Sequence, residues 1–436
     1  MFPENTNFLG LPAGIAAPRT RETGAMQWRR AVVTLVAAAL LALGAADPGA
    51  GAQAGDPLAA VNMLLDEREA ALAAGDLSAW MATVDPEAPA AFRDRQRTAF
   101  AGWGVVPVER FALDARTDDT GDLALGMQAE LVGRYRADAV FLPETRRHFR
   151  LAGYDDRDTV EYLWLTYVRR GDQWYIGGDE DLRFLGLDTA VTLWELGPVE
   201  VQRSEHFLVV SPPDRAGRAQ QIIEVAERAW TRFEDQWDRP WSGRLPVILP
   251  GSVADLETIL QTTFDLDNFV AFVAYDAIRD DGYEPTAPRM YIQDANLSRH
   301  SGAFQLDTMV HELVHAATST TAGPFNEPWV HEGLAEWVTR GSPAGGRAPS
   351  GSDGRLPEPH EFTTGGNAAI VRSYEESTSA FAFLAGRVGA GEPVRFFEQL
   401  GARRVVPGSA DHHAGDVLRA VADLNLRAFE EAWSGG

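Results

Sequence analysis

The sequence of 436 residues contains no cysteine and no lysine. Without cysteine the chain can form no disulfide bond, no thiolate zinc site and no cysteine nucleophile. Its 39 basic side chains are therefore all arginines, and they face 63 acidic residues, which gives a net charge of −24. Because phosphate binding relies on clustered positive charge, this balance argues against nucleic acid and against an anionic membrane surface as partners.

Long apolar runs are also scarce. The longest, Ala31–Ala46, has about 16 residues, whereas a membrane-spanning helix needs about 20. It follows Arg29-Arg30 and precedes the small-residue triplet Ala52-Gln53-Ala54, an order typical of a cleaved export signal. We therefore expect residues 1–54 to form an N-terminal extension with a signal peptide, and the protein to be exported. The alternative is a single-pass N-terminal anchor that stays uncleaved. Nothing in the pattern indicates an oligomeric state.

The first part of the remaining chain, residues 55–190, is predicted to be an α+β domain. Apolar residues first recur at helical spacing and later alternate with a period of two. The predicted helices are Leu58–Ala74, Leu77–Val84 and Ala88–Phe100. The predicted strands of an antiparallel sheet are Val108–Arg116, Ala124–Tyr135, Glu144–Leu151, Val160–Arg170 and Gln173–Gly178. Helices followed by such a sheet are typical of the α+β class.

This part resembles the NTF2-like (SnoaL-like) cone fold. The resemblance rests on the opening EREAALAAGDLSAWMATVDPEA and on the closing hairpin TYVRRGDQWYIGGDED, and it covers about residues 57–185. It implies a cone-shaped binding or association module. No compact set of titratable residues in this part indicates chemistry.

The second part, residues 191–436, is predicted to be a mixed sheet followed by helices. The expected strands are His206–Ser211, Leu245–Leu249, Phe269–Tyr275 and Arg289–Gln293. The expected helices are Arg215–Trp237, Val253–Gln261, Phe304–Thr320, Ala368–Val388, Pro393–Leu400 and Asp416–Trp433. A Gly-, Ser- and Pro-rich stretch, Gly341–Gly354, is predicted to be a surface loop.

The chemistry is concentrated in the helix at Phe304–Thr320, which contains the HExxH motif His311-Glu312-Leu313-Val314-His315. Residues four apart lie on one face of a helix, so both imidazoles can bind one ion. Zinc accepts neutral imidazole nitrogen and keeps an open position for water in catalytic sites. Glu312 can then take a proton from that water. The alternative, two unrelated helix-surface histidines, is less probable because a second motif follows.

That second motif, Pro328-Trp329-Val330-His331-Glu332-Gly333-Leu334-Ala335-Glu336-Trp337, supplies a carboxylate that HExxH lacks as a third ligand. Together, HELVH and PWVHEGLAEW resemble the gluzincin branch of the HExxH metallopeptidases, within the peptidase MA-like superfamily. The resemblance covers about residues 200–436, with its strong motifs between Val310 and Trp337. It implies Zn²⁺ as cofactor and Glu332 as the third zinc ligand.

The resemblance also implies roles around the metal. Glu336, one turn after Glu332, matches an acid that hydrogen-bonds a zinc-bound histidine; the alternative is a solvated helix charge. His331 could orient His315 or stabilise the oxyanion, and a structural role fits it equally. Tyr374 matches a tyrosine that donates to the tetrahedral intermediate, although the K-G half of that Y-x-K-G segment is missing. Ordinary packing is the alternative for Tyr374.

Substrate binding is assigned to a strand. In this superfamily the substrate commonly adds as a strand to an exposed sheet edge before the active-site helix, so we expect Arg289, Met290, Tyr291, Ile292 and Gln293 to bind it. No GxMEN-like segment is found, which puts aminopeptidase action in doubt and leaves endopeptidase or other amide cleavage open.

The sequence thus predicts an α+β protein: an NTF2-like cone domain, then a zincin-type domain with a mixed sheet, an active-site helix and a helical C-terminal part. The expected function is hydrolysis of peptide or protein substrates by a zinc-activated water with Glu312 as general base. The alternative is a non-catalytic binding or scaffold protein that uses the NTF2-like pocket beside a vestigial peptidase domain.

Overall fold

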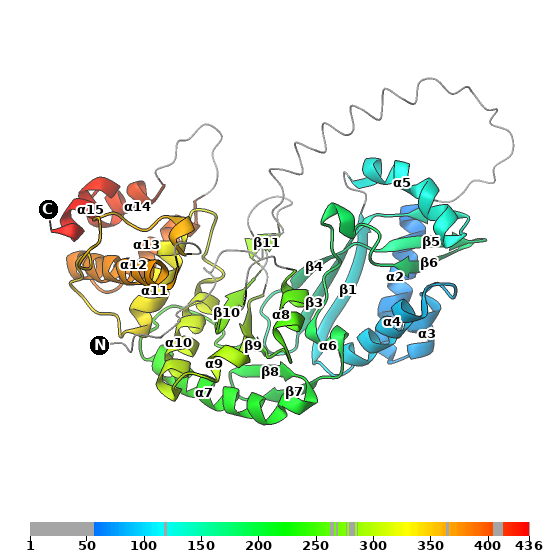
Figure 1. The fold of residues 1–436 in the computed structure, drawn as a ribbon, viewed down its shortest axis with the longest axis horizontal. Helices are drawn as coiled ribbons and strands as arrows, with labels where there is room; N and C mark the ends of the chain where they lie inside the picture. Colours follow the sequence, from blue (N-terminus) through cyan, green and yellow to red (C-terminus); the bar gives the residue numbers. More distant parts are fainter. Residues whose placement is uncertain are drawn as a thin grey trace, which may run out of the picture.

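The computed structural model describes residues 56–116, 120–261, 266, 269–275, 277–278, 284–285, 287–362, 366–403 and 413–435. The predicted extension and signal peptide, residues 1–54, lie outside these residues. Among the helices that are described, none combines the length and apolarity that crossing a membrane requires. The fold is mixed α+β with a helical C-terminal part, as predicted. Figure 1 shows the chain running from the N-terminal elements at one end, through a central sheet, to these helices at the other.

We call residues 56–190 the N-terminal module. It begins with three helices, α2 (Pro57–Ala74), α3 (Leu77–Ala82) and α4 (Ala90–Trp103). Helix α2 starts at an Asp56 cap and ends at Gly75, whose φ of 66° is the left-handed conformation that favours glycine. The rest of the module contains β1 (Val108–Arg116), α5 (Thr120–Tyr135), β2 (Ala139–Phe141), β3 (Glu144–Leu151), β4 (Thr159–Leu163), β5 (Thr166–Arg170), β6 (Gln173–Gly178) and η1 (Arg183–Leu185).

The strands of this module form two antiparallel sheets of three strands, with orders β1-β3-β4 and β2-β5-β6. The antiparallel pairing agrees with the prediction, but the strand expected at Val160–Arg170 is wrong. It is divided at Trp164-Leu165 into β4 and β5, which belong to different sheets. The apolar run Tyr162-Leu163-Trp164-Leu165 continues through this point, so the sequence pattern does not reveal the break.

The strand predicted at Ala124–Tyr135 is also wrong, because these residues belong to helix α5. The segment is rich in Ala, Leu, Met, Gln and Glu, which are strong helix formers. Leu131 is buried, and Met127, one turn earlier, packs against the same cluster. These two side chains are four residues apart, about one helical turn, and pack against the same cluster, as a helix places them.

The C-terminal module, residues 191–435, contains a mixed five-stranded sheet of order β10-β13-β9-β8-β7. The strands β8, β9 and β13 run parallel, and β7 and β10 are antiparallel to their neighbours at the two ends. The strand bounds are β7 Glu200–Arg203, β8 Phe207–Ser211, β9 Leu245–Ile248, β10 Ala271–Ala274 and β13 Arg289–Ile292. A separate two-stranded sheet joins β11 (Ala277–Ile278) to β12 (Glu284–Pro285).

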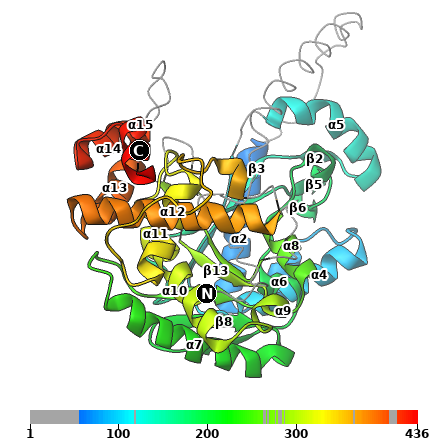
Figure 2. The ribbon, with the colours of Figure 1, turned by 60° about the vertical axis from the view of Figure 1, so that its left-hand side comes forward.

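The helices of this module are α6 Leu193–Leu196, η2 Pro213–Arg215, α7 Ala216–Glu234, α8 Val253–Leu260, α9 Asp294–Leu297, α10 Gly302–Thr318, α11 Pro328–Thr339, η3 Pro359–Phe362, α12 Asn367–Val388, α13 Glu392–Gly401, α14 His413–Ala422 and α15 Leu426–Ser434. Helices α7 and α10 pack on one face of the five-stranded sheet and α6 packs on the other. Helices α11 to α15 continue beyond the sheet (Figure 2). The single helix expected at Asp416–Trp433 is two helices. The chain turns at Asp423, which has a φ of 54°, and Asn425 caps α15.

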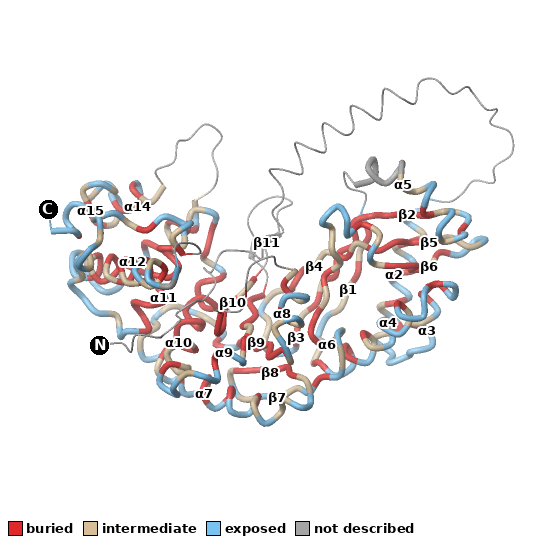
Figure 3. Tube along the Cα trace, viewed as in Figure 1, coloured by how far each residue is buried: buried red, intermediate tan, exposed pale blue. Residues whose placement is uncertain are grey.

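Both faces of the sheet are buried along the inner strands β8, β9 and β13, which are mostly red in Figure 3, whereas β7 at one end is partly exposed. Along β8, Phe207 and Val209 belong to the core shared with α7 and α10, whereas Leu208 and Val210 belong to a second core. That second core also includes Phe149 from β3 of the N-terminal module. The N-terminal module therefore covers the face of the sheet that α7 and α10 leave free.

Candidate metal centre

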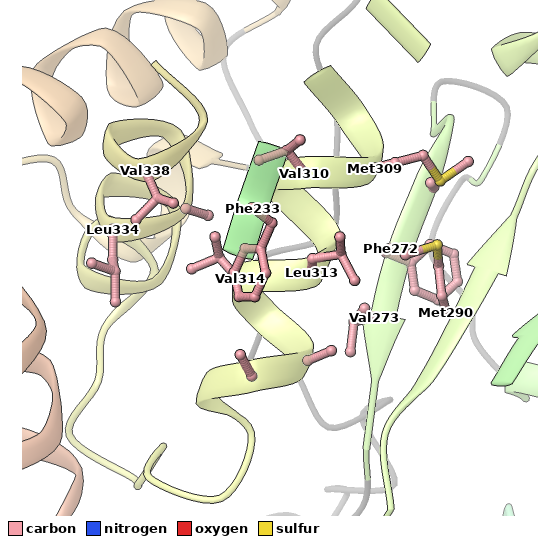
Figure 4. Packing of buried hydrophobic residues seen from close by; sticks show 14 of the residues in the cluster. Phe233, Phe272, Val273, Met290, Met309, Val310, Leu313, Val314, Leu334 and Val338 are labelled. Carbon is pink, nitrogen blue, oxygen red and sulfur yellow. The ribbon is translucent and has the colours of Figure 1, made fainter. Parts of the chain in front are cut away.

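Helix α10 carries the HExxH motif and lies against the sheet. Ser301 caps its N-terminus by accepting a hydrogen bond from the Phe304 N–H. Its apolar side chains pack between the strands β10 and β13 on one side and helix α11 on the other (Figure 4). This packing fixes the helix along its length, so the motif's polar residues are held within an apolar surrounding.

Helix α11 carries the second motif and begins at Pro328, which suits a first helical position. Gly333 permits its close approach to α12, since a Cβ there would lie 2.7 Å from the Phe381 ring and 2.9 Å from the Ser377 carbonyl oxygen. The glycine after Glu332 therefore has a packing role. The approach places α12, with Tyr374, beside the same site.

The three predicted metal ligands converge. His315 Nε2 lies 2.9 Å from His311 Nε2, His311 Nε2 lies 3.1 Å from Glu332 Oε2, and His315 Nε2 lies 3.6 Å from the same Glu332 oxygen. All three residues are buried, with Glu332 0% exposed. They are a group whose ligand atoms could hold a metal ion.

The spacing of these atoms fits a small tetrahedral ion. Two ligands at about 2.0–2.1 Å from zinc in tetrahedral geometry are about 3.3–3.4 Å apart. The observed separations of 2.9 to 3.6 Å bracket that value. Two imidazoles and one carboxylate are also the donor set of known catalytic zinc sites, which leave the fourth position open. The residues present therefore fit a zinc ion.

Glu312 lies beside this group and is 2% exposed. The Val273 backbone N–H of β10 donates to its carboxylate, while Glu312 Oε2 has no hydrogen-bond partner among the described residues. Burial raises the pKa of Glu312, against the opposing effect of His311 and His315. A buried carboxylate oxygen without a partner is costly, so a position beside it suits a polar ligand such as water.

Glu336 contacts the first histidine. Its Oε1 lies 3.1 Å from His311 Nδ1, and its Oε2 lies 3.2 Å from Arg340 Nε. Burial alone would raise the pKa of Glu336, but the hydrogen bond with His311 and the charge of Arg340 outweigh it and lower the pKa. A hydrogen bond from Nδ1–H to this carboxylate leaves Nε2 free to bind a metal. Glu336 is therefore a buried partner of His311 and not a solvated helix charge.

Tyr374 lies on the other side of the triad. It is 4% exposed, and its ring centroid is 6.4 Å from that of His311. Its hydroxyl hydrogen-bonds Glu332. Burial and the surrounding carboxylates of Glu332, Glu336 and Glu312 raise its pKa well above the usual value. The phenol therefore remains a protonated donor near the metal position.

His331 is buried and neutral, because burial and the nearby His315 lower its pKa to about 3. Its ring lies 6.4 Å from that of His315 and packs at 5.1 Å against Phe397. Its Nδ1 has no hydrogen-bond partner in the described part of the chain. These contacts join α11 to α13 and include no hydrogen bond to His315.

The predicted substrate strand, Arg289–Gln293, is wrong as a sheet edge. Residues 289–292 form β13, which pairs with β10 on one side and β9 on the other, so its backbone cannot add another strand. Met290 and Ile292 are buried in the core beneath α10, and the Gln293 side chain caps α9. The alternation of apolar and polar residues along a strand does not show which strands lie beside it in the sheet.

The remaining two side chains of this strand point away from the metal centre. The Arg289 guanidinium binds Asp155 of the N-terminal module at 2.7 and 2.6 Å and donates to Thr159 at 2.8 Å. Tyr291 packs against the core shared with that module. Both also line a cavity of about 60 Å³ between the modules, and no metal-centre residue lines that cavity.

Two features of the centre were not predicted. Arg340 follows Glu336 by four residues, a spacing that could have indicated the ion pair from the sequence. The contact between the Val273 N–H and Glu312 depends on how β10 lies beside α10, and no local signal encodes it. No protein-family model matches the chain, and no curated protein matches it.

Proposed function

We propose that the chain is an exported zinc-dependent peptidase. One observation supports this most strongly: His311 Nε2, His315 Nε2 and Glu332 Oε2 converge within reach of one ion, beside a buried Glu312 carboxylate oxygen that has no partner among the described residues. Two sequence motifs supply these groups, and 16 residues separate His315 from Glu332.

A bound zinc ion would supply a Lewis acid for the scissile carbonyl and would lower the pKa of a water at its open position. Glu312 would hold the proton that the attacking water gives up as its oxygen bonds to the carbonyl carbon. The same carboxyl then gives the proton to the departing amine when the C–N bond breaks. Tyr374 donates a hydrogen bond to the negative oxygen that develops on the carbonyl.

The position of β10 favours a peptide as substrate. Within the described residues β10 ends the sheet, and its Val273 N–H faces Glu312. An extended peptide that followed this strand would bring a backbone carbonyl close to the base. Strand addition uses backbone groups alone, so it is compatible with cleavage inside a chain and does not require a free amine.

A binding or scaffold role, with a vestigial peptidase domain, is the rival function. It is disfavoured because all four side chains that the reaction requires are present: His311, Glu312, His315 and Glu332. A purely structural zinc would have a fourth protein ligand. The group of described residues around the site offers three ligand residues.

The test uses the parent protein and Glu312→Gln, with metal content measured by elemental analysis and hydrolysis measured on a mixed peptide library. The substitution removes the base while it preserves the three ligands. We expect about one zinc per chain in both proteins, and cleavage in the parent only. Full hydrolytic activity in Glu312→Gln, or a lack of zinc in the parent, would refute the proposal. Zinc in both with cleavage in neither would favour the binding role.

A further inference from the structure

A line of contacts connects the surface of the protein to the first metal ligand. Arg340 Nε and Nη2 lie 3.2 and 3.1 Å from Glu336 Oε2, and Glu336 Oε1 lies 3.1 Å from His311 Nδ1. The Arg340 side chain is 37% exposed, whereas that of Glu336 is 6% exposed. Arg340 thus reaches from the solvent-facing end of α11 to a carboxylate that the protein interior encloses.

The backbone that carries Arg340 is held in place. Arg232 of α7 donates a hydrogen bond to the Thr339 carbonyl oxygen, which fixes the last residue of the helix. The Gly341 N–H donates to the Val338 oxygen at 2.9 Å, and the Ser342 N–H donates to the Trp337 oxygen at 2.9 Å. Because these hydrogen bonds already fix the backbone at the end of α11, the contact between Arg340 and Glu336 costs side-chain entropy but little backbone entropy.

The charge of the centre gives Arg340 a second effect. Glu312, Glu332 and Glu336 are three buried carboxylates within one site. A divalent ion offsets two of these negative charges, and a buried charge without compensation is unfavourable. Arg340 is the arginine that contacts a carboxylate of this group in the described structure. Its single positive charge brings the formal sum of the loaded centre to zero.

We propose that Arg340 is a positioning residue of the metal centre, which acts through Glu336 to orient His311 and to balance the charge of the bound ion. This role rests on the proposed zinc function. It concerns affinity for the metal, so it can be measured without substrate turnover. A residue that acts through another has a defined signature: its removal has no effect once the intermediate residue is absent.

The experiment is a double-mutant cycle on zinc affinity, measured by competition with a chelator of known affinity, for the parent, Arg340→Gln, Glu336→Gln and the double variant. Loss of a direct partner of a metal-bound histidine typically weakens binding by about 10- to 100-fold, and we expect this for Glu336→Gln. For Arg340, one contact further away, we expect about a three- to tenfold loss. In the Glu336→Gln background, Arg340→Gln should change the affinity by less than about twofold.

Two controls separate this role from damage to the fold. Arg427→Gln removes a matched ion pair, in which Arg427 Nε lies 2.8 Å from Glu431 Oε1 four residues later on α15, and it should bind zinc like the parent. Arg340→Lys keeps the charge, and it should recover most of the affinity that Arg340→Gln loses. Failure of Arg340→Lys to recover affinity would contradict the charge role.

The outcomes also distinguish the two proposals. Equal zinc affinity in the parent and Arg340→Gln would refute the role of Arg340 and leave the zinc function standing. The same fold loss from Arg340→Gln in both backgrounds would mean that Arg340 does not act through Glu336. A parent that binds no zinc would refute the zinc function and this role with it.

Discussion

At the residue scale, the proposed chemistry depends on which side chains of the candidate metal centre are protonated. Tyr374 is buried among three carboxylates, and both effects raise the pKa of its hydroxyl well above the usual value. The phenol is therefore protonated at neutral pH and can donate a hydrogen bond. Donation to a developing oxyanion stabilises the transition state more than the ground state, so its loss lowers kcat rather than raising KM.

Tyr374→Phe is accordingly expected to lower kcat by about 10²- to 10³-fold with little change in KM. Steady-state kinetics on the best peptide from the library measures both constants. Tyr291→Phe is the matched control, because that tyrosine packs on the opposite face of the sheet, and it should retain the parent kcat. Equal activity in Tyr374→Phe and the parent would leave Tyr374 with a packing role only.

If Glu312 is the general base, as we propose, its ionisation sets the acid limit of the reaction. It must be ionised to accept a proton, and burial raises its pKa above the usual glutamate value. Activity should therefore be full above this raised pKa and fall as the pH decreases through it. A profile of kcat/KM against pH locates the limb, with zinc content determined at each pH so that loss of the metal is distinguished from protonation of Glu312. An acid limb at or below the pKa of an ordinary glutamate would contradict the assignment.

The three residues that could hold a metal ion, His311, His315 and Glu332, lie together as the sequence predicts. The spacing of His311 and His315 on one helix is a local property, and the second motif adds Glu332 and Glu336 in register. The surroundings of Arg289, by contrast, cannot be predicted from the sequence pattern. Its strand was predicted within one residue of its observed bounds, yet neither its neighbours in the sheet nor the face toward which Arg289 points can be derived from periodicity. Both depend on partners distant in the sequence.

At the element scale, the same limit explains the errors in the N-terminal module. The sequence predicts a strand at α5 because leucine and alanine occur in both patterns. It predicts one strand for β4 and β5 because the apolar run Tyr162–Leu165 spans the division between them. What holds these elements together is a set of non-local contacts. Arg147 of β3 binds Glu161 of β4 at 2.8 Å and Glu195 of α6 at 2.6 Å, and its side chain is 4% exposed.

Arg147→Met should therefore destabilise the protein strongly. Burial alone would raise the pKa of Glu195, but the charge of Arg147 outweighs it and lowers the pKa, so the carboxylate is ionised in the folded state. Removal of the arginine leaves two enclosed carboxylates without their partner, at a cost of about 3–5 kcal/mol in the free energy of unfolding. Urea unfolding at neutral pH measures this loss.

The control for this change is Arg97→Met. It removes a pair with Asp94 whose side chains are 48% and 74% exposed, and such pairs contribute about 0–1 kcal/mol. Below the folded-state pKa of Glu195 the difference between Arg147→Met and the parent should become smaller, because protonation removes the charge that Arg147 neutralises. If Arg97→Met and Arg147→Met lowered the free energy of unfolding equally, the buried network would stabilise the protein no more than an exposed ion pair does.

At the scale of the whole molecule, the central sheet connects the two modules. One face supports α10 and the metal centre, and the other is covered by the N-terminal module through a shared apolar core that includes Trp103, Phe149 and Trp194. Gly102 of α4 lies so close to the junction that a Cβ there would be 1.7 Å from the Trp194 carbonyl oxygen. Arg289 adds a buried ion pair with Asp155, with side chains 6% and 1% exposed.

This arrangement predicts that the two modules unfold together. Separation would expose the back of the sheet to water and would break the Arg289–Asp155 ion pair, so we expect neither module to be stable alone. Differential scanning calorimetry of the protein without its N-terminal extension should show one transition, with equal calorimetric and van't Hoff enthalpies. Arg289→Met should lower the free energy of unfolding by about 3–5 kcal/mol and move the whole transition to lower temperature. Arg299→Met, at an exposed position, should change the free energy of unfolding by less than about 0.5 kcal/mol. Two separate transitions, with only one sensitive to Arg289→Met, would mean that the N-terminal module is an independent attachment. A single transition would make it a structural part of the sheet on which the metal centre is built.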